Sequence, residues 1–438
     1  MKKHIIASFI AATVALPTAH AESLSEVYNL AKAHDPSLRA ANASYRADKE
    51  QVEVTRGNLY PNISFSGNLG YTDTNPDNAD SYSNTQNQLA LNLDYPIYSP
   101  ALDYGVDAVE ITFASAGVEL EQAKEQLIFN TLNDYFAVLT AQATLDTTRS
   151  QVKSYAGQLD RVKKQYEVGL VSVTDLQDAQ AAYDSILVTE LEAESDLTIA
   201  LESLYQRTGQ SIEDIPRLSD SFPIEVDPNL NADALIKRAM TSNKSIQVLD
   251  LSVESAQNNI DIQKASGRVP TVSITGSLAR TDNNYSTETS SRQDGVTNTA
   301  SIGLGVAIPL YSGGAISASV RQAVASAESV FESRASSIQD IELSIRSAVL
   351  QLKTLAAQVK AQQQVIRSSE SALEATQAGY DVGTRNIVEL LDAQSTYFDA
   401  KNTYEQLRYS FVLQQITLDQ LTGDLSEEDI AELNQWLI

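Results

Sequence analysis

Residues 166–170 read Tyr166-Glu167-Val168-Gly169-Leu170, and residues 380–384 read Tyr380-Asp381-Val382-Gly383-Thr384, nearly the same pentapeptide 214 positions later. Other matches keep almost the same offset. They are Asp178-Ala179-Gln180 with Asp392-Ala393-Gln394, Thr208-Gly209 with Thr422-Gly423, and the corners Tyr95-Pro96-Ile97-Tyr98-Ser99 with Ile308-Pro309-Leu310-Tyr311-Ser312. A nearly constant offset over separate matches indicates an internal duplication, and the order of elements within one copy therefore predicts the fold of both.

The duplication divides the chain into a first repeat over residues 22–210 and a second over 231–425. The connector between them, residues 211–230, contains three prolines and is typical of a linking segment. Residues 426–438 follow the second repeat as a C-terminal tail. We expect the two repeats to have the same elements in the same order.

Each repeat is predicted to contain two strands, because apolar residues alternate with small polar ones there. The predicted strands are 62–71 and 88–95 in the first repeat, and 271–280 and 300–308 in the second. In the first of them Ile63, Phe65, Leu69 and Tyr71 share one face.

Long helices are predicted around the strands, because apolar residues recur there at intervals of three and four positions. The predicted helices are 24–57, 99–168 and 172–208 in the first repeat, and 232–266, 313–382 and 386–422 in the second. The heptad-like spacing of Ile128, Leu132, Tyr135 and Leu139 favours coiled-coil packing. The long helices should form hairpins that turn at Gly169 and Gly383.

The four strands have the length and the single apolar face of membrane-spanning strands, which need about 9–11 residues. Four strands cannot close a barrel, for which about eight is the practical minimum. Two copies would give eight strands around an interior filled by side chains, whereas three would give twelve strands around a lumen. The small polar residues of the other face suit a wet lumen, which favours a homotrimer. A small soluble sheet with one face on a core remains the alternative.

The N-terminus is typical of a secretory signal peptide over residues 1–21. Lys2 and Lys3 precede a run of twelve apolar residues, and Ala19-His20-Ala21 is a cleavage motif that would leave Glu22 as the first mature residue. The alternative, an anchoring helix, is disfavoured because about twenty apolar residues are needed to span a bilayer.

The composition excludes several classes of function. Acidic residues number 57 against 31 basic ones, and the net charge of −26 argues against a nucleic-acid partner. Cysteine is absent, and His34 is the one histidine beyond the predicted cleavage site. We therefore expect no enzyme activity, catalytic residue, metal site or cofactor. A trimeric surface adhesin, a structural stalk and a soluble exported enzyme remain as alternatives.

The segments Tyr166-Glu-Val-Gly-Leu-Val-Ser-Val-Thr-Asp-Leu176 and Ala378-Gly-Tyr-Asp-Val-Gly-Thr-Arg-Asn-Ile-Val-Glu-Leu-Leu-Asp-Ala393 resemble those of the outer membrane efflux protein family. The resemblance covers residues 22–425. It implies an α+β membrane protein in the Gram-negative outer membrane. Its homotrimeric 12-stranded β-barrel, with four strands per chain, would contact outer-membrane lipid and continue into a 12-helix periplasmic α-barrel of long coiled-coil hairpins.

The resemblance also implies a passive exit channel for tripartite efflux pumps and type I protein secretion. The implied partners are a periplasmic adaptor (membrane fusion) protein and inner-membrane pumps of the RND, ABC or MFS type. These partners would open the tunnel at its periplasmic end.

The resemblance assigns Glu389 and Asp392 to two rings of carboxylates at the entrance, which threefold symmetry would build and which would attract cations. The family usually has aspartate at the first position, so ring diameter and cation affinity are expected to differ here. Read from the residues alone, the two carboxylates are an ordinary solvated helix face.

Four further residues are assigned by resemblance to a latch that holds the entrance closed. Arg385 and Tyr380 would bond to Asp175 and Thr174 of the other hairpin or of a neighbouring copy. The alternative is a routine surface ion pair at Arg385 and ring packing at Tyr380.

The hairpin tips, Gly169-Leu170 and Gly383-Thr384, are assigned by resemblance to adaptor contacts. Glycine at the end of a helix usually forms a left-handed cap, which would explain the glycines without an adaptor. It would not explain the exposed Leu170 beside Gly169.

Overall fold

The computed structural model describes residues 23–77, 80–212, 215–287 and 293–438. The predicted cleavage site between Ala21 and Glu22 lies outside these ranges. The chain divides into two compact units, each built from both repeats. Unit 1 comprises Met1–Pro36, Lys124–Leu235 and Ile345–Ile438, and unit 2 comprises Ser37–Ala123 and Ile236–Ser344.

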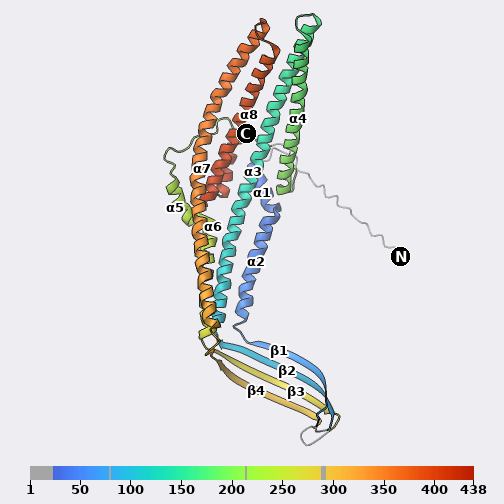
Figure 1. Ribbon diagram of the computed structural model, residues 1–438, viewed down its shortest axis with the longest axis vertical. Helices are drawn as coiled ribbons and strands as arrows, with labels where there is room; N and C mark the ends of the chain where they lie inside the picture. The colour runs from blue at the N-terminus through green and yellow to red at the C-terminus, as the bar shows by residue number, and fades with distance from the viewer. Residues whose placement is uncertain (1–22, 78–79, 213–214, 288–292) are drawn as a thin grey trace, which may run out of the picture. The chain divides into compact units, whose positions relative to one another are not determined.

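Unit 2 contains a four-stranded antiparallel sheet in the order β1-β2-β3-β4 (Figure 1). Its strands are β1 (Asn62–Thr74), β2 (Tyr82–Tyr98), β3 (Thr271–Tyr285) and β4 (Gly295–Ala307). The central pairing, β2 with β3, joins the two repeats. Four strands per chain confirm the prediction, but their bounds differ from it.

The bounds predicted as 88–95 and 300–308 are wrong at their starts, which lie at Tyr82 and Gly295. The strands predicted over 62–71 and 271–280 continue to Thr74 and Tyr285. Most of the added residues are polar, on both faces, so alternation of apolar residues could not mark them. Ladder pairing with the neighbouring strand holds them extended, for example Ser83 with Asp73.

The register gathers the apolar side chains on one face, because directly paired residues on neighbouring strands share a face. Phe65 pairs with Leu91, which pairs with Leu278. The next row on the opposite face is polar: Ser64 pairs with Asn92, and Asn92 with Ser277. Phe65 is 71% exposed. A single chain therefore presents an apolar sheet face to its surroundings.

The helices predicted over 24–57 and 232–266 are wrong as single helices, because each is broken at one residue. The first divides into α1 (Leu24–His34) and α2 (Pro36–Gly57), and the second into α5 (Ala232–Ser242) and α6 (Lys244–Arg268). Asp35 takes an extended ψ of 120°, as the residue before a proline commonly does. Asn243 takes a ψ of 122° and caps α6 by accepting a bond from the Ile246 N–H.

The long helices follow their predicted bounds to within two residues. They are α3 (Pro100–Glu167), α4 (Val173–Thr208), α7 (Ala315–Asp381) and α8 (Ile387–Thr422). In unit 1, α4 and α8 both end at glycines with a left-handed φ, 72° at Gly209 and 77° at Gly423. Along the described stretches, none of the helices is apolar enough over a sufficient length to cross a membrane.

In unit 1 the connector pairs with the C-terminal tail, which contains α9 (Glu427–Asn434). The Arg217 N–H donates to the Ile438 carbonyl, the Ile438 N–H donates back to the Arg217 carbonyl, and the Ser219 N–H donates to the Trp436 carbonyl, each at 2.8 Å. These bonds form a short antiparallel bridge. The tail is therefore an ordered part of unit 1.

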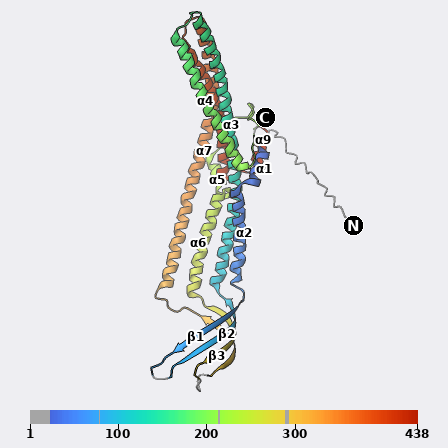
Figure 2. The ribbon, with the colours of Figure 1, turned by 90° about the vertical axis from the view of Figure 1, so that its right-hand side faces the viewer.

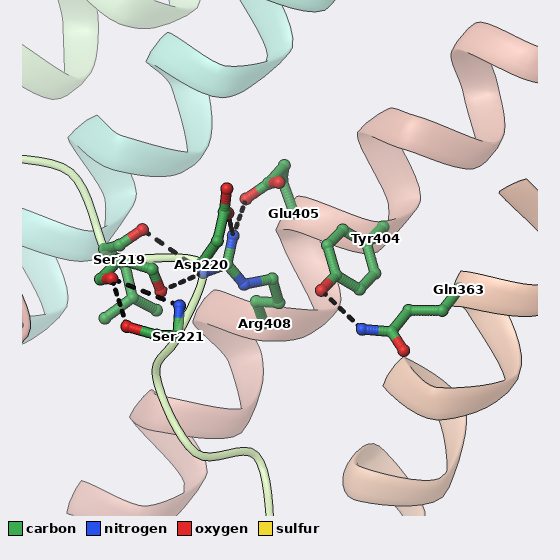
Figure 3. A network of polar contacts seen from close by, with 8 residues as sticks. Ser219, Asp220, Ser221, Gln363, Tyr404, Glu405 and Arg408 are labelled. Carbon is green, nitrogen blue, oxygen red and sulfur yellow. Dashed lines mark hydrogen bonds and ion pairs between the residues drawn. The ribbon is translucent and has the colours of Figure 1, made fainter.

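Arg408 on α8 points toward the connector residues Ser219 and Asp220 and binds them (Figure 3). Its side chain is 2% exposed. Nη2 donates to the carbonyls of Ser219 at 2.6 Å and Leu218 at 3.3 Å, and Nη1 donates to Glu405 at 2.9 Å and Asp220 at 3.1 Å. Burial raises the pKa of the Glu405 carboxyl, and the Arg408 charge opposes that rise. One buried cation thus satisfies backbone carbonyls and a half-buried carboxylate together.

Candidate functional site at the two hairpin turns

The hairpins α3–α4 and α7–α8 of unit 1 turn at the same end of that unit (Figures 1 and 2). The turns have the same backbone. Gly169 and Gly383 have φ of 76° and 78°, and their N–H groups donate to the carbonyls of Tyr166 at 2.9 Å and Tyr380 at 3.0 Å. The prediction that the chain turns at these two glycines is confirmed. Glycine suits both positions because a left-handed φ strongly favours it.

The residue after each turn caps the next helix. Ser172 and Asp175 form a reciprocal capping box, in which Asp175 Oδ2 accepts from the Ser172 N–H at 3.0 Å and the Ser172 hydroxyl at 2.9 Å. In the second repeat Asn386 accepts from the Glu389 N–H at 2.9 Å. Asp175 and Glu389 therefore occupy equivalent positions, and the Asp175 carboxylate already has partners in its own turn.

A single apolar cluster lies behind both turns, and it holds the two hairpins together. It combines side chains of α3, α4 and α8, and Leu373 and Tyr380 of α7 pack against it. The cluster consists of Tyr155, Leu159, Val162, Ala179, Ile186, Ile387, Leu390 and Leu391. Tyr380 therefore packs its ring at a helix seam, as one of the two sequence interpretations proposed.

Polar contacts also join α3 to α7 near the turns. They are Tyr380 Oη donating to Gln165 Oε1, Arg161 Nη1 with Asp381 Oδ1, and Gln158 Nε2 donating to Gln377 Oε1, each at 2.9 Å. Sequence reasoning named Tyr380 but missed its partner and the other four residues, because their pairing depends on which helices become neighbours. The signal that could have found them is position, since Gln165 and Asp381 adjoin the repeated tyrosines.

Within one chain, the residues predicted to form the latch bond to other partners. Tyr380 was expected to bond to Thr174 or Asp175 but donates to Gln165. The pKa of the Tyr380 hydroxyl is raised, first by burial and then by the nearby Asp175 carboxylate. Arg385 was expected to bond to Asp175, but its Nη1 donates to Glu389 Oε2 at 3.2 Å.

The two predicted ring carboxylates differ in their surroundings. The Glu389 side chain is 42% exposed and pairs with Arg385. Asp392 is exposed one turn further along α8. It lines a cavity of about 550 Å³ together with Asp178, its counterpart in the first repeat. Within the stretches that the structure describes, no group of three His, Cys, Asp or Glu side chains could hold a metal ion.

The tips of the turns expose apolar side chains. In the first turn Leu170 is 75% exposed and Val168 is 70% exposed. In the second turn Val382, at the position of Val168, is 74% exposed. Thr384, at the position of Leu170 in the second repeat, donates from its hydroxyl to the Gly379 carbonyl at 3.0 Å. A group of exposed apolar side chains at the tips of the turns is typical of a contact surface.

Comparisons with known proteins agree with this architecture. The family model described as outer membrane efflux protein matches residues 27–210 and 235–424. Outer membrane protein TolC of Salmonella enteritidis is 31% identical over 95% of this chain and 85% of its own. The proteases secretion protein PrtF of Dickeya chrysanthemi is 24% identical over 96% of this chain and 92% of its own.

Among solved structures, the CmeC outer membrane channel of Campylobacter jejuni has a TM-score of 0.76 at 18% identity, over 95% of this chain and 90% of that one. This likeness supports the fold. The resemblance inferred from the repeated motifs is confirmed, because the family model covers both repeats. The chain belongs to the outer membrane efflux protein family.

Proposed function

We propose that three copies of this chain close a twelve-stranded barrel in the outer membrane and a twelve-helix tunnel on its periplasmic side. The family and its outer-membrane efflux and secretion relatives favour an exit channel over an adhesin or a stalk. The observation that carries the trimer is the sheet, whose apolar face is exposed and whose edges, β1 and β4, each lack a partner on one side within the described chain. Membrane barrels tolerate neither open edges nor a break in the apolar band.

The polar rows of the sheet favour three copies over two. Asn92 lies between Ser64 and Ser277, and Ser277 pairs onward with Ser301, so short polar side chains cross all four strands. Eight strands would enclose a space that side chains fill, while twelve leave a lumen. Short polar residues facing inward suit that wet lumen. The channel would be passive, with no chemistry of its own.

The hairpin turns would form the periplasmic entrance. Threefold symmetry would arrange Glu389 and Asp392 as two acidic rings that favour cations. Arg385 uses Nη1 for Glu389, which leaves Nη2 and Nε as donors toward a neighbouring copy. Thr174 and Asp175 of that copy remain the proposed partners of Tyr380 and Arg385. Tyr380 Oη donates its one proton to Gln165, so it would accept from the Thr174 hydroxyl, while Asp175 would accept from Arg385.

The test of the function is single-channel recording with purified trimers in planar lipid bilayers, after extraction from outer membranes with detergent. We expect a small, cation-selective current, because the proposed closed entrance would be lined by rings of carboxylates. Correctly folded trimers that pass no current would overturn the channel function and favour the adhesin or stalk. A monomer in detergent would overturn the proposed assembly.

The exposed tip of the first hairpin is the proposed contact for the periplasmic adaptor, through which an RND, ABC or MFS pump would engage the channel. Leu170→Asp should reduce co-purification of the adaptor by about tenfold or more, because burying a charge where an apolar side chain packed is strongly unfavourable. Leu191→Asp, at a residue 65% exposed on α4 and outside the turn, is the matched control. Equal adaptor recovery from the Leu170→Asp variant and wild type would contradict the assignment.

A further inference from the structure

Gly379, in the last turn of α7, lies under the beginning of the Arg385 side chain. A methyl group on Gly379 would lie 2.7 Å from Arg385 Cγ and 3.3 Å from Thr384 Oγ1. Carbon atoms pack at about 3.5–4.0 Å. Arg385 Cγ can move away only by rotation about the Cα–Cβ bond or by a shift of the backbone. Either movement carries the rest of the side chain, including the guanidinium, to a new position.

The carbonyl of Gly379 also stabilises the turn that follows, by accepting hydrogen bonds from Thr384 and Arg385. That oxygen accepts from the Thr384 N–H at 2.8 Å, the Arg385 N–H at 3.2 Å and the Thr384 hydroxyl at 3.0 Å. The backbone of Arg385 is thereby fixed against the end of α7. Its side chain starts over Gly379 and ends at Glu389, with Nη1 3.2 Å from Oε2.

The first repeat shows that the turn itself does not need this glycine. There Gln165 occupies the position of Gly379, and the Leu170 N–H donates to its carbonyl at the same 2.8 Å. Gly379 has no left-handed φ either. The repeats differ in the residues that follow the turn, where the first has Val171 at the position that Arg385 occupies in the second.

We propose that Gly379 is a positioning residue that seats Arg385 against Glu389, so that the guanidinium neutralises the Glu389 ring while the entrance is at rest. Asp392 then supplies the exposed acidic ring. Glu389 contributes its charge once Arg385 leaves it. This inference rests on the proposed channel function and adds to it which carboxylate selects cations in the resting state.

The test measures the ratio of potassium to chloride permeability from reversal potentials of single trimers. Asp392→Asn should lower the ratio several-fold, and removal of the whole ion pair in the double variant Arg385→Gln with Glu389→Gln should change it less than twofold. Gly379→Ala leaves every charge in place but frees Glu389, so it should raise the ratio at least twofold. In the double variant Gly379→Ala with Glu389→Gln, that increase should disappear.

The matched control is Gly157→Ala, a helical glycine of α3 at which a methyl group would meet nothing within 4 Å. It should keep the wild-type ratio. If Gly379→Ala fails to assemble, Arg385→Gln with Gly379 intact tests the same masking. Arg385→Gln should also raise the permeability ratio, and that increase should be lost when Glu389→Gln is added.

Two results would overturn the proposal. One is an Arg385→Gln, Glu389→Gln double variant that loses as much selectivity as Asp392→Asn, because Glu389 would then be unmasked at rest. The other is an increase in Gly379→Ala that survives the addition of Glu389→Gln. Wild-type trimers that pass no current would instead overturn the channel function itself, which keeps the two failures distinct.

Discussion

Replacing Arg161 by Ser and Tyr380 by Phe in the same chain is expected to raise the single-channel conductance of the trimer several-fold. Both changes remove contacts between α3 and α7: the Arg161–Asp381 ion pair and the hydrogen bond from Tyr380 to Gln165. A tunnel that widens by parting its hairpins must break these contacts, so they stabilise the closed state alone. Substituting them should shift the population toward the open state.

The size of the effect follows from the threefold repetition of weak contacts. A neutral hydrogen bond contributes about 1 kcal/mol and an exposed ion pair about 0.2–1 kcal/mol, so three copies together contribute on the order of 5 kcal/mol. Every 1.4 kcal/mol changes a population ratio by about tenfold. No single contact holds the entrance shut, yet their loss together should open it in a large fraction of trimers.

The control for this variant is Arg149→Ser. Arg149 lies on the same helix and is similarly exposed, 51% against 46% for Arg161, but its ion pair with Glu194 lies within the first hairpin. Its loss should leave the conductance unchanged. An Arg161→Ser, Tyr380→Phe trimer with wild-type conductance would show that these contacts do not hold the entrance closed.

The second large effect is expected for Arg408→Met, which should lower the free energy of local opening of the connector by about 2–4 kcal/mol. Methionine fills a similar volume, but the carbonyls of Leu218 and Ser219 lose their donors and Glu405 loses the charge beside it. The readout is hydrogen exchange of the amides of Arg217, Ser219 and Ile438 in purified trimers. It should accelerate by roughly 30- to 700-fold, since local opening becomes that much more favourable.

The variant should also become sensitive to pH. Burial already raises the pKa of Glu405 above its ordinary value, and without Arg408 that pKa should rise further. A carboxyl whose pKa is raised in the folded state lowers the stability of that state as the pH rises from its ordinary pKa through the raised one. The loss of stability in Arg408→Met should therefore be smaller in acid than at neutral pH.

Arg346→Met is the control for the Arg408 variant. It removes an exposed arginine that pairs with Asp233 at 2.7 Å and should leave the exchange of Arg217 and Ser219 unaltered. Unchanged exchange in Arg408→Met itself would mean that the bridge to the tail holds the connector without this side chain.

The comparison of repeats predicted most of the fold because the periodicity of the long helices and strands is local. The breaks at Asp35 and Asn243 were missed, although Pro36 marks the first and the duplication places the second at the matching point. The polar end of β2 could not be predicted from Tyr82 onward, because strand pairing, and not alternation, extends it.

The site was predicted less completely than the fold. The turn glycines, Leu170 and the carboxylates of α8 stand in repeated motifs, and the structure places them together near the turns. The partners of Tyr380 and Arg385 depend on side-chain reach across helices. For Arg385, in the turn before α8, the longer glutamate at position 389 supplies a partner in the first turn of that helix. A shorter aspartate would reach Arg385 less well.

The pairing of β2 with β3 dictates an order of assembly. Leu91 and Leu278 are neighbours in the sheet, yet the α3–α4 hairpin, the connector and both helices α5 and α6 lie between them along the chain. Closing so long a loop is entropically costly until the intervening helices have folded and shortened it. The β1–β2 and β3–β4 hairpins can form early, whereas the full sheet forms late, and its apolar strands must be shielded from water until they enter the bilayer.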